Sequence, residues 1–370
     1  MARDIVKSNI AAVAVNHGST NAFTTSDLGL RLYMGVQNFG YSIQLPRQNL
    51  KQVGSQDFVF NGLTQQPDVA LSISYIAQPQ ISNEFNGNFT TEVNAYSKFN
   101  NFFSGTLENS SNFYVFIDPN QQDDIFDDLK PFDESRLNLS GFDAIAFGNC
   151  YPTSYEISYA VGTLPIVSTN YICSNVVFEN LTGTTMQMPA INLTGGNNNN
   201  VGLCEFEFEQ NTTYDNKPII SNPTNANSSI TLQNLQVGGQ PLSGIHLVQS
   251  LAMSVNLSRI SSYGLGNDFA YDRKAQLPAE GKFSVSSLVS GLDSGVLTGV
   301  LDSYKNYDFE LALASADHFG SPAKAIYQIE DAKLDSYNYE MAVNGQMSFA
   351  AEFSFSVTET KGLKISGTYV

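Results

Sequence analysis

The side chains that most often perform acid–base, nucleophilic or metal chemistry are few in this chain and stand apart. Its three histidines are His17, His246 and His318, and none has a second histidine four residues away. Isolated histidines of this kind are more often ordinary surface or core residues than metal ligands. The Gly-x-Ser-x-Gly, Gly-x-x-x-x-Gly-Lys and His-Glu-x-x-His patterns are absent. Nothing therefore indicates a nucleophilic serine, a phosphate-binding loop or a zinc-dependent protease.

The acidic residues offer two weaker possibilities. The segment Asp118-Pro119-Asn120, followed by Asp123-Asp124, has part of the pattern of a calcium-binding loop but lacks its central glycine and closing glutamate. A carboxylate pair for glycoside hydrolysis is left open by the residues alone, although the chain contains no Trp that could stack on a sugar. We expect no enzyme, with no catalytic residue, no cofactor and no metal site.

Cysteine usage and hydropathy indicate where the protein resides. The three cysteines are Cys150, Cys173 and Cys204; they lack metal-ligand spacing, and an odd number cannot all pair within one chain. Free buried thiols in a reducing cytoplasm are the expected state. The first residues, MARDIVKS, contain no apolar segment of a secretory signal, and no run of about 18 apolar residues indicates a membrane span.

Composition restricts the possible partners. The net charge is −17 over 370 residues, which argues against specific nucleic-acid binding, because that requires basic patches. Acidity is first of all a solubility device, but it also suits a protein that lets nucleic acid pass without adhering. Charged residues make up only 14%, against a typical ~25%. The neutral polar surface this implies fits extensive contacts with copies of the same chain, or simply a surface rich in Asn and Ser.

The chain repeats itself. Residues 36–47 (VQNFGYSIQLPR) reappear as 248–259 (VQSLAMSVNLSR), and residues 154–161 (SYEISYAV) reappear as 336–343 (SYNYEMAV). Two copies of one small fold are therefore predicted, and not a solenoid. The first offset is 212 positions and the second 182, so the first repeat carries roughly 30 extra residues, placed within 78–140 as loop insertions. We assign residues 1–175 to the first domain, 176–240 to a linker and loop-rich segment, and 241–370 to the second domain.

The local patterns predict strands. Phe349, Ala351, Phe353, Phe355 and Val357 alternate with small or polar residues, as in a strand with one buried face. Residues 154–161 and 336–343 alternate in the same phase, so both repeats are expected to bury the same face. One helix of about two and a half turns is predicted at 121–130.

The segment 263–274 (YGLGNDFAYDRK), preceded by Leu257-Ser258-Arg259 and followed by Gln276-Leu277-Pro278, resembles the major tail (tail tube) proteins of long-tailed bacteriophages. The strand pair 154–174, with VGTLP at its turn, is similar to their paired strands. The resemblance covers most of the chain and is densest over 245–289. The first repeat departs from it, since residues 48–56 and Asn61-Gly62 stand in place of the Tyr-Gly-Leu-Gly and Asp-Arg-Lys elements. That repeat has either diverged or meets a different partner.

The resemblance implies a mainly β fold: two tandem tail-tube-like β-sandwich domains with few short helices, whose strands join those of neighbouring subunits in a closed barrel. The barrel would surround a channel that DNA crosses without specific binding. The loops 47–67 and 259–278 would pack against adjacent subunits. If the family ring has six positions, a chain with two repeats fills them as a trimer. The implied location is the virion tail, assembled in the host cytoplasm beside other phage tail proteins, with no membrane partner.

Two sets of candidate residues follow. Candidate intersubunit contacts combine charge and aromatic rings, which suits interface cores, although an ordinary surface turn would look much the same; they are Arg47, Asp57, Phe58, Arg259, Tyr263, Asp268, Tyr271, Asp272 and Arg273. Candidate lumen-facing carboxylates are Glu156, Glu340 and Glu352, whose strand faces are otherwise simply solvated. The alternatives are another tail, fibre, baseplate or decoration component built from the same sandwich, a pilus or surface-layer protein, and an enzyme.

Overall fold

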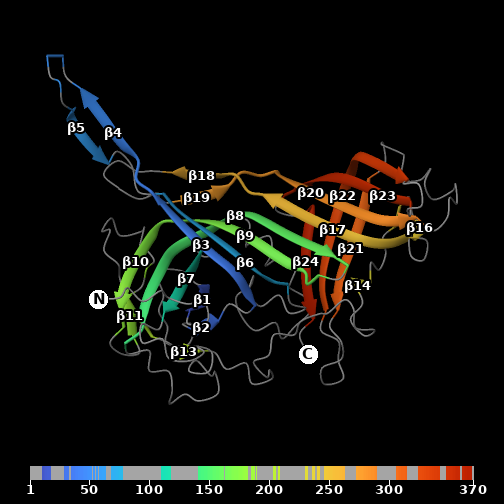
Figure 1. The fold of residues 1–370 in the computed structure, drawn as a ribbon, viewed down its shortest axis with the longest axis horizontal. Coiled ribbons are helices and arrows are strands. Elements are labelled where there is room, and N and C mark those ends of the chain that lie inside the picture. The colour runs from blue at the N-terminus through green and yellow to red at the C-terminus, as the bar shows by residue number, and fades with distance from the viewer. Residues whose placement is uncertain are drawn as a thin grey trace.

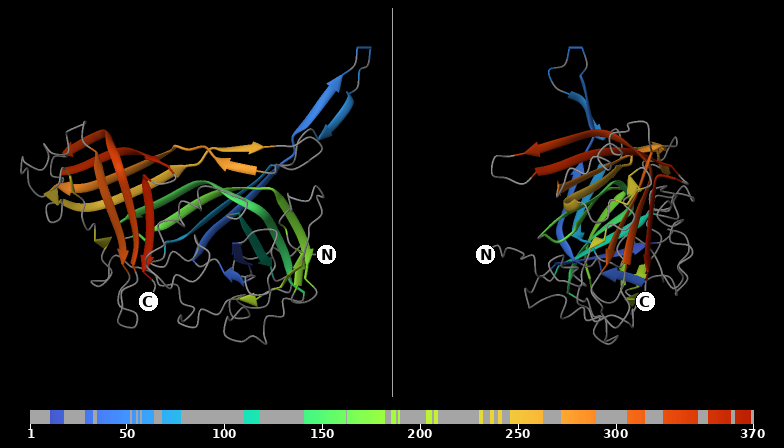
Figure 2. Two further views of the ribbon diagram at one scale, coloured as in Figure 1. Left: turned by 180° about the vertical axis from the view of Figure 1, so that it is seen from behind. Right: turned by 90° about the vertical axis from the view of Figure 1, so that its right-hand side faces the viewer.

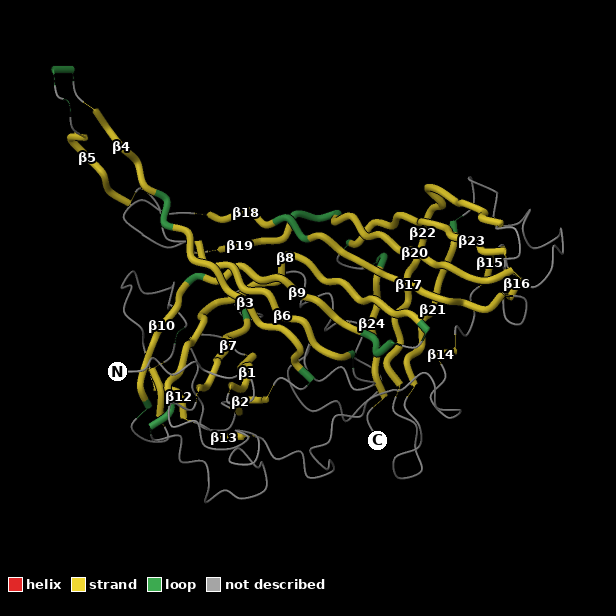
Figure 3. The backbone as a smooth tube through the Cα atoms, in the orientation of Figure 1, coloured by secondary structure: helices red, strands yellow, loops and turns green. Residues whose placement is uncertain are grey.

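A computed structural model gives the fold, and the prediction of a mainly β protein is confirmed. It describes residues 11–17, 29–32, 35–51, 53–54, 56, 58–63, 68–77, 110–117, 141–161, 163–181, 185–187, 189, 203–205, 207–208, 230–231, 236–237, 240–241, 246–262, 272–289, 306–314, 324–341, 347–358 and 361–368. This part of the chain consists of strands and their connections, without a helix (Figure 3). The helix predicted at 121–130 lies outside the described residues.

Eight antiparallel strands form one continuous layer, which we call the long sheet. Four come from each repeat, in the spatial order β3 (Val36–Gln44), β6 (Asp68–Ile76), β9 (Ile166–Cys173), β8 (Asp143–Ala160), β17 (His246–Asn256), β20 (Ala279–Val289), β23 (Met347–Val357) and β22 (Lys324–Met341). The two repeats meet where β8 pairs with β17. The halves are therefore joined by backbone hydrogen bonds across one sheet.

A second layer covers the apolar side of each half. The first eight residues or so of β8 pair with β7 (Ser111–Ile117) and β10 (Asn175–Asn180), and β7 pairs in turn with β1 (Ala11–His17), which pairs with β2 (Gly29–Leu32). In the other half, β22 pairs with β21 (Tyr307–Ala314) and β24 (Leu363–Thr368). Figure 1 shows β21 and β24 crossing the direction of β17 and β20. Because β8 and β22 belong to both layers, each half closes as an orthogonal sandwich.

Short strands and two hairpins complete the described part. Pairs of two or three residues involve β11 (Thr185–Gln187), β12 (Leu203–Glu205), β13 (Glu207–Phe208), β14 (Ile230–Thr231), β15 (Gln236–Val237) and β16 (Gln240–Pro241). The hairpins are β4 (Arg47–Lys51) with β5 (Phe58–Leu63), and β18 (Arg259–Ser262) with β19 (Asp272–Ala275). Figure 2 shows the β4–β5 hairpin projecting from the body of the molecule, whereas β18–β19 lies along it. The domain boundaries at 175 and 240 stay predictions. The first of them falls within β10, which pairs with β8 of the first repeat.

The repeats share the irregularities of their strands. The bulge at Gln37 recurs at Gln249, and the bulge at Thr153 recurs at Asp335. β-bulges re-aim and bend strands and are specific features of a fold. Their recurrence at the offsets of the sequence repeat allows strands of the two halves to be matched residue by residue.

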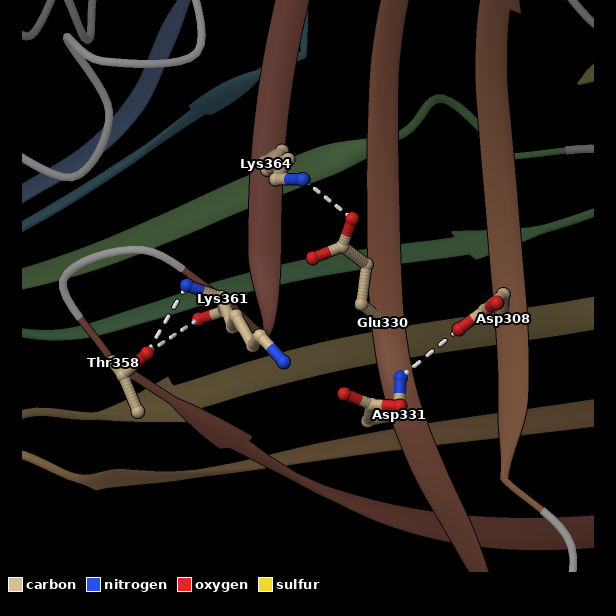
Figure 4. Close-up of polar contacts among 6 residues, drawn as sticks. All are labelled: Asp308, Glu330, Asp331, Thr358, Lys361 and Lys364. Atoms are coloured by element: carbon tan, nitrogen blue, oxygen red, sulfur yellow. Dashed lines mark hydrogen bonds and ion pairs between the residues drawn. The ribbon is translucent and has the colours of Figure 1, made fainter.

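A left-handed residue recurs in the same way. Asn149 has a φ of 49° and Asp331 a φ of 57°. The backbone N–H of each donates to a side-chain carbonyl or carboxylate oxygen on the neighbouring strand, Asn112 Oδ1 at 3.1 Å and Asp308 Oδ1 at 3.0 Å. Figure 4 shows the second of these contacts, near the Glu330–Lys364 ion pair between β22 and β24 and the Thr358–Lys361 turn. β8 and β22 thus share one local feature, a left-handed residue whose backbone N–H donates to a side-chain oxygen of the neighbouring strand.

Equivalent core positions of the two repeats hold side chains of different size, and a smaller residue at one position is balanced by a larger one opposite it. Val69 lies opposite Cys173 in the first repeat, and the equivalent pair in the second repeat is Gly281 opposite Phe355. A Cβ atom on Gly281 would lie 2.3 Å from the Phe355 ring, so the glycine makes room for the larger neighbour. Volume-conserving exchange of this kind preserves a packed core.

The alternation predicted for 349–357 is confirmed in β23, where Ala351, Phe353, Phe355 and Val357 are buried. In β8 the prediction is confirmed for Tyr155, Ile157 and Tyr159, which are buried, and is wrong for Val161, which lies exposed in the turn that follows the strand. In β22 the prediction is wrong for Tyr337, whose side chain is about half exposed in the single chain. The reason is positional: β8 lies in the middle of the long sheet, and β22 lies at its end.

Candidate self-assembly edges

One face of the long sheet carries mainly small polar side chains. Serines recur on this face in both repeats; they include Ser42, Ser72, Ser74, Ser154, Ser158, Ser168, Ser254, Ser284, Ser336 and Ser354. The candidate carboxylates Glu156, Glu340 and Glu352 belong to the same face and are exposed. Ser336 Oγ donates to Glu352 Oε2 over 3.1 Å. That this face lines a lumen stays a prediction.

The pairing of β8 with β17 shows how this sheet joins two repeats. Tyr155 lies opposite Val255, and Ile157 lies opposite Met253, and all four side chains are fully buried. The contact continues past the strand end, where Leu257 N–H donates to Thr153 O over 2.8 Å. We call this pairing the internal joint. It combines a backbone ladder with an apolar seam on the side away from the serine-rich face.

A buried hydrogen bond locks the internal joint. The hydroxyl of Tyr155 lies 3.3 Å from that of Tyr327, which belongs to β22 in the second repeat. Both rings are almost completely buried. Because a buried hydroxyl is costly without a partner, this contact favours one arrangement of the two halves.

The β18–β19 hairpin is fastened to the first repeat through Arg259. Its Nε donates to Pro152 O over 2.6 Å and its Nη1 to Arg273 O over 3.0 Å. The guanidinium lies over the Tyr151 ring at 5.4 Å from the centroid, a cation–π contact. Burial lowers the pKa of Arg259 to about 10. The side chain predicted to contact another subunit thus binds the other half of its own chain, and its intersubunit role stays a prediction.

Arg273, on β19, is only 1% exposed. Its Nε and Nη1 have no hydrogen-bond partner among the described residues. Burying a guanidinium costs free energy unless nearby groups pair with it and accept its hydrogen bonds. This burial leaves little of the side chain free for the subunit contact predicted for it.

The other candidate contacts lie on or near the two hairpins. Arg47 begins β4 and is exposed. Phe58 begins β5 and Asp272 begins β19, and nothing is described of either side chain. Asp57, Tyr263, Asp268 and Tyr271 lie outside the described residues. The structure therefore brings Arg259 and Arg273 together, and places Arg47 on the separate, projecting hairpin.

The long sheet has two free edges. Within the described part of the chain, β3 pairs only with β6, and residues 336–341 of β22 pair only with β23. Sheet edges with unpaired N–H and C=O groups are templates for pairing with another chain unless they are protected. Both edges here are long strands without a proline in their paired residues.

Each free edge exposes the apolar residues that its counterpart buries in the internal joint. Ile43 is 40% exposed and its equivalent Val255 is fully buried. Leu45 is 51% exposed, against 2% for Leu257. On the other edge Tyr337 is 48% exposed, and its equivalent Tyr155 is fully buried.

These edge residues are not among the candidate residues predicted from the sequence. The signal that could have found them is the repeat itself. With only two repeats in the chain, one strand of each repeat, β3 in the first and β22 in the second, lacks the neighbour that its counterpart has in the internal joint. The alternating apolar positions Tyr41, Ile43 and Leu45 were visible in the sequence, but strand order in the sheet was not.

Other kinds of site find no support in the described residues. They include no group of three or more His, Cys, Asp or Glu side chains that could hold a metal ion. The described part of the chain also contains no helix long and apolar enough to cross a membrane. The free thiols Cys150 and Cys173 are both buried.

Comparison with known proteins gives little. No family model matches the chain, and no curated protein matches it. Among solved structures, a chain from the virion of a native gene transfer agent particle is similar, with 13% identity and a TM-score of 0.24, over 39% of this chain and 96% of that chain. A likeness of this size leaves function to be argued from the chain's own geometry.

Proposed function

We propose that this protein is a structural virion component that polymerises as stacked rings into the tube of a phage tail. The observation that carries the proposal is the pair of free, apolar edges at opposite ends of one sheet, β3 and β22. A chain with complementary edges at its two ends forms head-to-tail contacts, which close into rings or continue as filaments. Closure removes the exposed edges that a single chain retains.

The ring is proposed to contain three chains. Each chain supplies eight strands to the long sheet, so three chains would make a barrel of about 24 strands, wide enough for an open channel. The ring would have pseudo-sixfold symmetry, because three internal joints would alternate with three joints between chains. Stacking of such rings would produce the tube.

The serine-rich face is proposed to line the channel. In a closed barrel the apolar side of the long sheet must face the covering layers β7, β10, β21 and β24, which leaves the polar face for the lumen. Its exposed charged side chains include the carboxylates Glu156, Glu280, Glu340 and Glu352, and the lysine Lys282, whose Nζ lies 3.9 Å from Glu280 Oε1. A wall of small hydroxyls and carboxylates would repel phosphate and let DNA pass during ejection.

Electron microscopy of the purified protein tests the proposal. We expect tubes or stacked rings in negative stain, and three chains per ring in a cryo-EM cross-section with the Glu156 side chain pointing into the channel. Six chains per ring would overturn the trimer. Monodisperse monomers at every protein concentration would overturn the tube and favour a fibre or decoration component.

A further inference from the structure

We infer that the joint between two chains repeats the internal joint residue by residue. In this arrangement β3 of one chain pairs antiparallel with β22 of a second copy of the chain, Ser42 lies opposite Asn338, and Arg47 reaches the backbone of Leu334. The inference rests on the proposed function, since it requires that the chains assemble edge to edge, and it adds the partner strand, the register and the anchoring residue.

The register follows from matching the strands of the repeats. The bulges at Gln37 and Gln249 align β3 with β17, and the bulges at Thr153 and Asp335 align β8 with β22. In the internal joint Ser254 lies opposite Glu156. The equivalent residues on the free edges are Ser42 and Asn338. A slip of one residue would turn every apolar side chain of the edge to the wrong face.

The seam of the proposed joint is filled by large side chains on both edges. Val255 opposite Tyr155 becomes Ile43 opposite Tyr337, and Met253 opposite Ile157 becomes Tyr41 opposite Tyr339. The Tyr339 hydroxyl is buried and has no hydrogen-bond partner among the described residues. Tyr41 would bring a second hydroxyl to that point, in an aromatic cross-strand pair of the kind that stabilises sheets.

The same matching of equivalent residues predicts where the projecting β4–β5 hairpin binds. Arg259, which binds Pro152 O in the internal joint, is equivalent to Arg47, and Pro152 is equivalent to Leu334. The Arg47 guanidinium would therefore donate to Leu334 O of the neighbouring chain and bring the β4–β5 hairpin onto it. In a single chain Arg47 is exposed and its hairpin extends from the body (Figure 1), as expected for an arm whose binding surface lies on another molecule.

The proposed joint is not identical to the internal one at the arginine. Tyr151, on which Arg259 stacks, is replaced by Lys333, and Thr153 is replaced by Asp335. Both replacements are exposed in the single chain. Asp335, the bulge residue, accepts a hydrogen bond from Ser354 Oγ over 2.9 Å, and its carboxylate charge partly offsets the like charge that Lys333 would present to Arg47. The joint between chains thus has a lysine and an aspartate where the internal joint has the stacked tyrosine ring and a threonine, and loss of the cation–π contact weakens it relative to the internal joint.

Disulfide trapping tests the register directly. The variant Ser42→Cys/Asn338→Cys places a thiol on each free edge, where both side chains are exposed, and directly opposed positions of an antiparallel pair lie within disulfide range. Ser254→Cys/Glu156→Cys is the matched positive control, because it closes the known internal pair within one chain. Ser42→Cys/Ser336→Cys is the slipped control, two residues out of register.

After mild oxidation with copper–phenanthroline we expect the matched pair to give a reducible ladder that ends at three chains on a non-reducing gel. The slipped pair should give at least about tenfold less product, because its Cα atoms lie near 7–8 Å. Rings in the microscope without this cross-link, or with equal cross-linking of the slipped pair, would overturn the register and leave the tube standing. Absence of any rings and of any intermolecular product, with the internal control still closed, would overturn both.

Discussion

The hydroxyl of Tyr155 lies 3.3 Å from that of Tyr327, and this contact joins the two repeats inside one chain. The residue equivalent to Tyr155 in the second repeat is Tyr337. It lies on the free edge of the long sheet, where no third repeat follows, and its side chain is 48% exposed. The two tyrosines therefore occupy equivalent positions of the repeat in two different environments. One lies inside a completed joint, and the other lies on an edge that a neighbouring chain would complete.

Replacing Tyr155 with Phe should lower the stability of the isolated chain. The variant removes one partner of a buried hydrogen bond and leaves the Tyr327 hydroxyl less well satisfied, at a cost of about 1 kcal/mol. Urea unfolding of dilute, unassembled protein measures the loss. Tyr337→Phe is the control, since its hydroxyl is on an exposed ring and its removal should leave the free energy of unfolding unchanged. Equal destabilisation by both variants would contradict the role of the Tyr155–Tyr327 contact.

Replacing Tyr337 with Asp should prevent assembly and leave the fold of the monomer intact. The side chain is half exposed in the single chain but would be buried against Ile43 in the proposed joint, where an unpaired carboxylate is expensive. Sedimentation velocity should show only monomer under conditions in which we expect the wild type to form rings. Phe178→Asp is the matched control, because Phe178 is an exposed aromatic residue on β10, away from both edges. Normal rings from Tyr337→Asp would contradict the use of this edge.

Replacing Lys333 with Tyr should strengthen the joint between chains. It restores at that joint the aromatic ring on which Arg259 stacks in the internal joint, a contact of about 0.5–1 kcal/mol. Rings should then form at about two- to fivefold lower protein concentration in light scattering. Lys333→Ser removes the like charge without adding a ring and separates the two effects. If Lys333→Ser assembles as readily as Lys333→Tyr, Arg47 does not stack at this position.

The comparison of β8 with β22 shows what the sequence could predict. Alternation in 154–161 and 336–343 predicted strands, and the structure confirms them as far as Ala160 in β8 and Met341 in β22, because side-chain period is a local property. The burial of Tyr155 and the exposure of Tyr337 depend on which strand lies beside each, and strand order arises from pairing between segments far apart in the chain. The repeat in the sequence predicted two similar units but not that β8 and β17 would be their point of contact.

The candidate site shows the same limit. Arg259 was selected for its charge beside aromatic residues, and the structure gives it partners, Pro152 O and the Tyr151 ring, that lie more than 100 positions away in the chain. Arg273 was selected on the same grounds and is buried. Residue type cannot separate these two outcomes, because both depend on how the hairpin folds onto the first repeat.

Stability should fall as the pH rises above about 8.5, the ordinary pKa of a cysteine in an unfolded chain. Burial, and then the neighbouring Cys173 thiol, raise the pKa of Cys150 well above its usual value. The folded chain therefore keeps a proton that the unfolded chain loses, and the free energy of unfolding decreases by up to about 1.4 kcal/mol per pH unit. Cys150→Ala, which introduces the residue found at the equivalent Ala332, should reduce this slope in urea titrations from pH 7.5 to 9.5. An unchanged slope would contradict the assignment to Cys150.

Reversing the charge of the serine-rich face should make assembled tubes bind DNA. The triple variant Glu156→Lys/Glu340→Lys/Glu352→Lys changes exposed side chains on the polar face. Glu340 lies on the β22 edge itself, but the apolar side chains on the opposite face of the sheet are unchanged, so the monomer and the apolar seam of the joints should be preserved. If this face lines the channel, lysines there should retain double-stranded DNA at low salt and release it as salt rises, since phosphate contacts are salt-dependent. Co-sedimentation of tubes with short DNA duplexes measures this. The corresponding triple Gln variant removes charge without attracting phosphate and should show little binding, as should the wild type. Tubes of the Lys variant that bind DNA only on their outer surface in cryo-EM would place these carboxylates outside the channel.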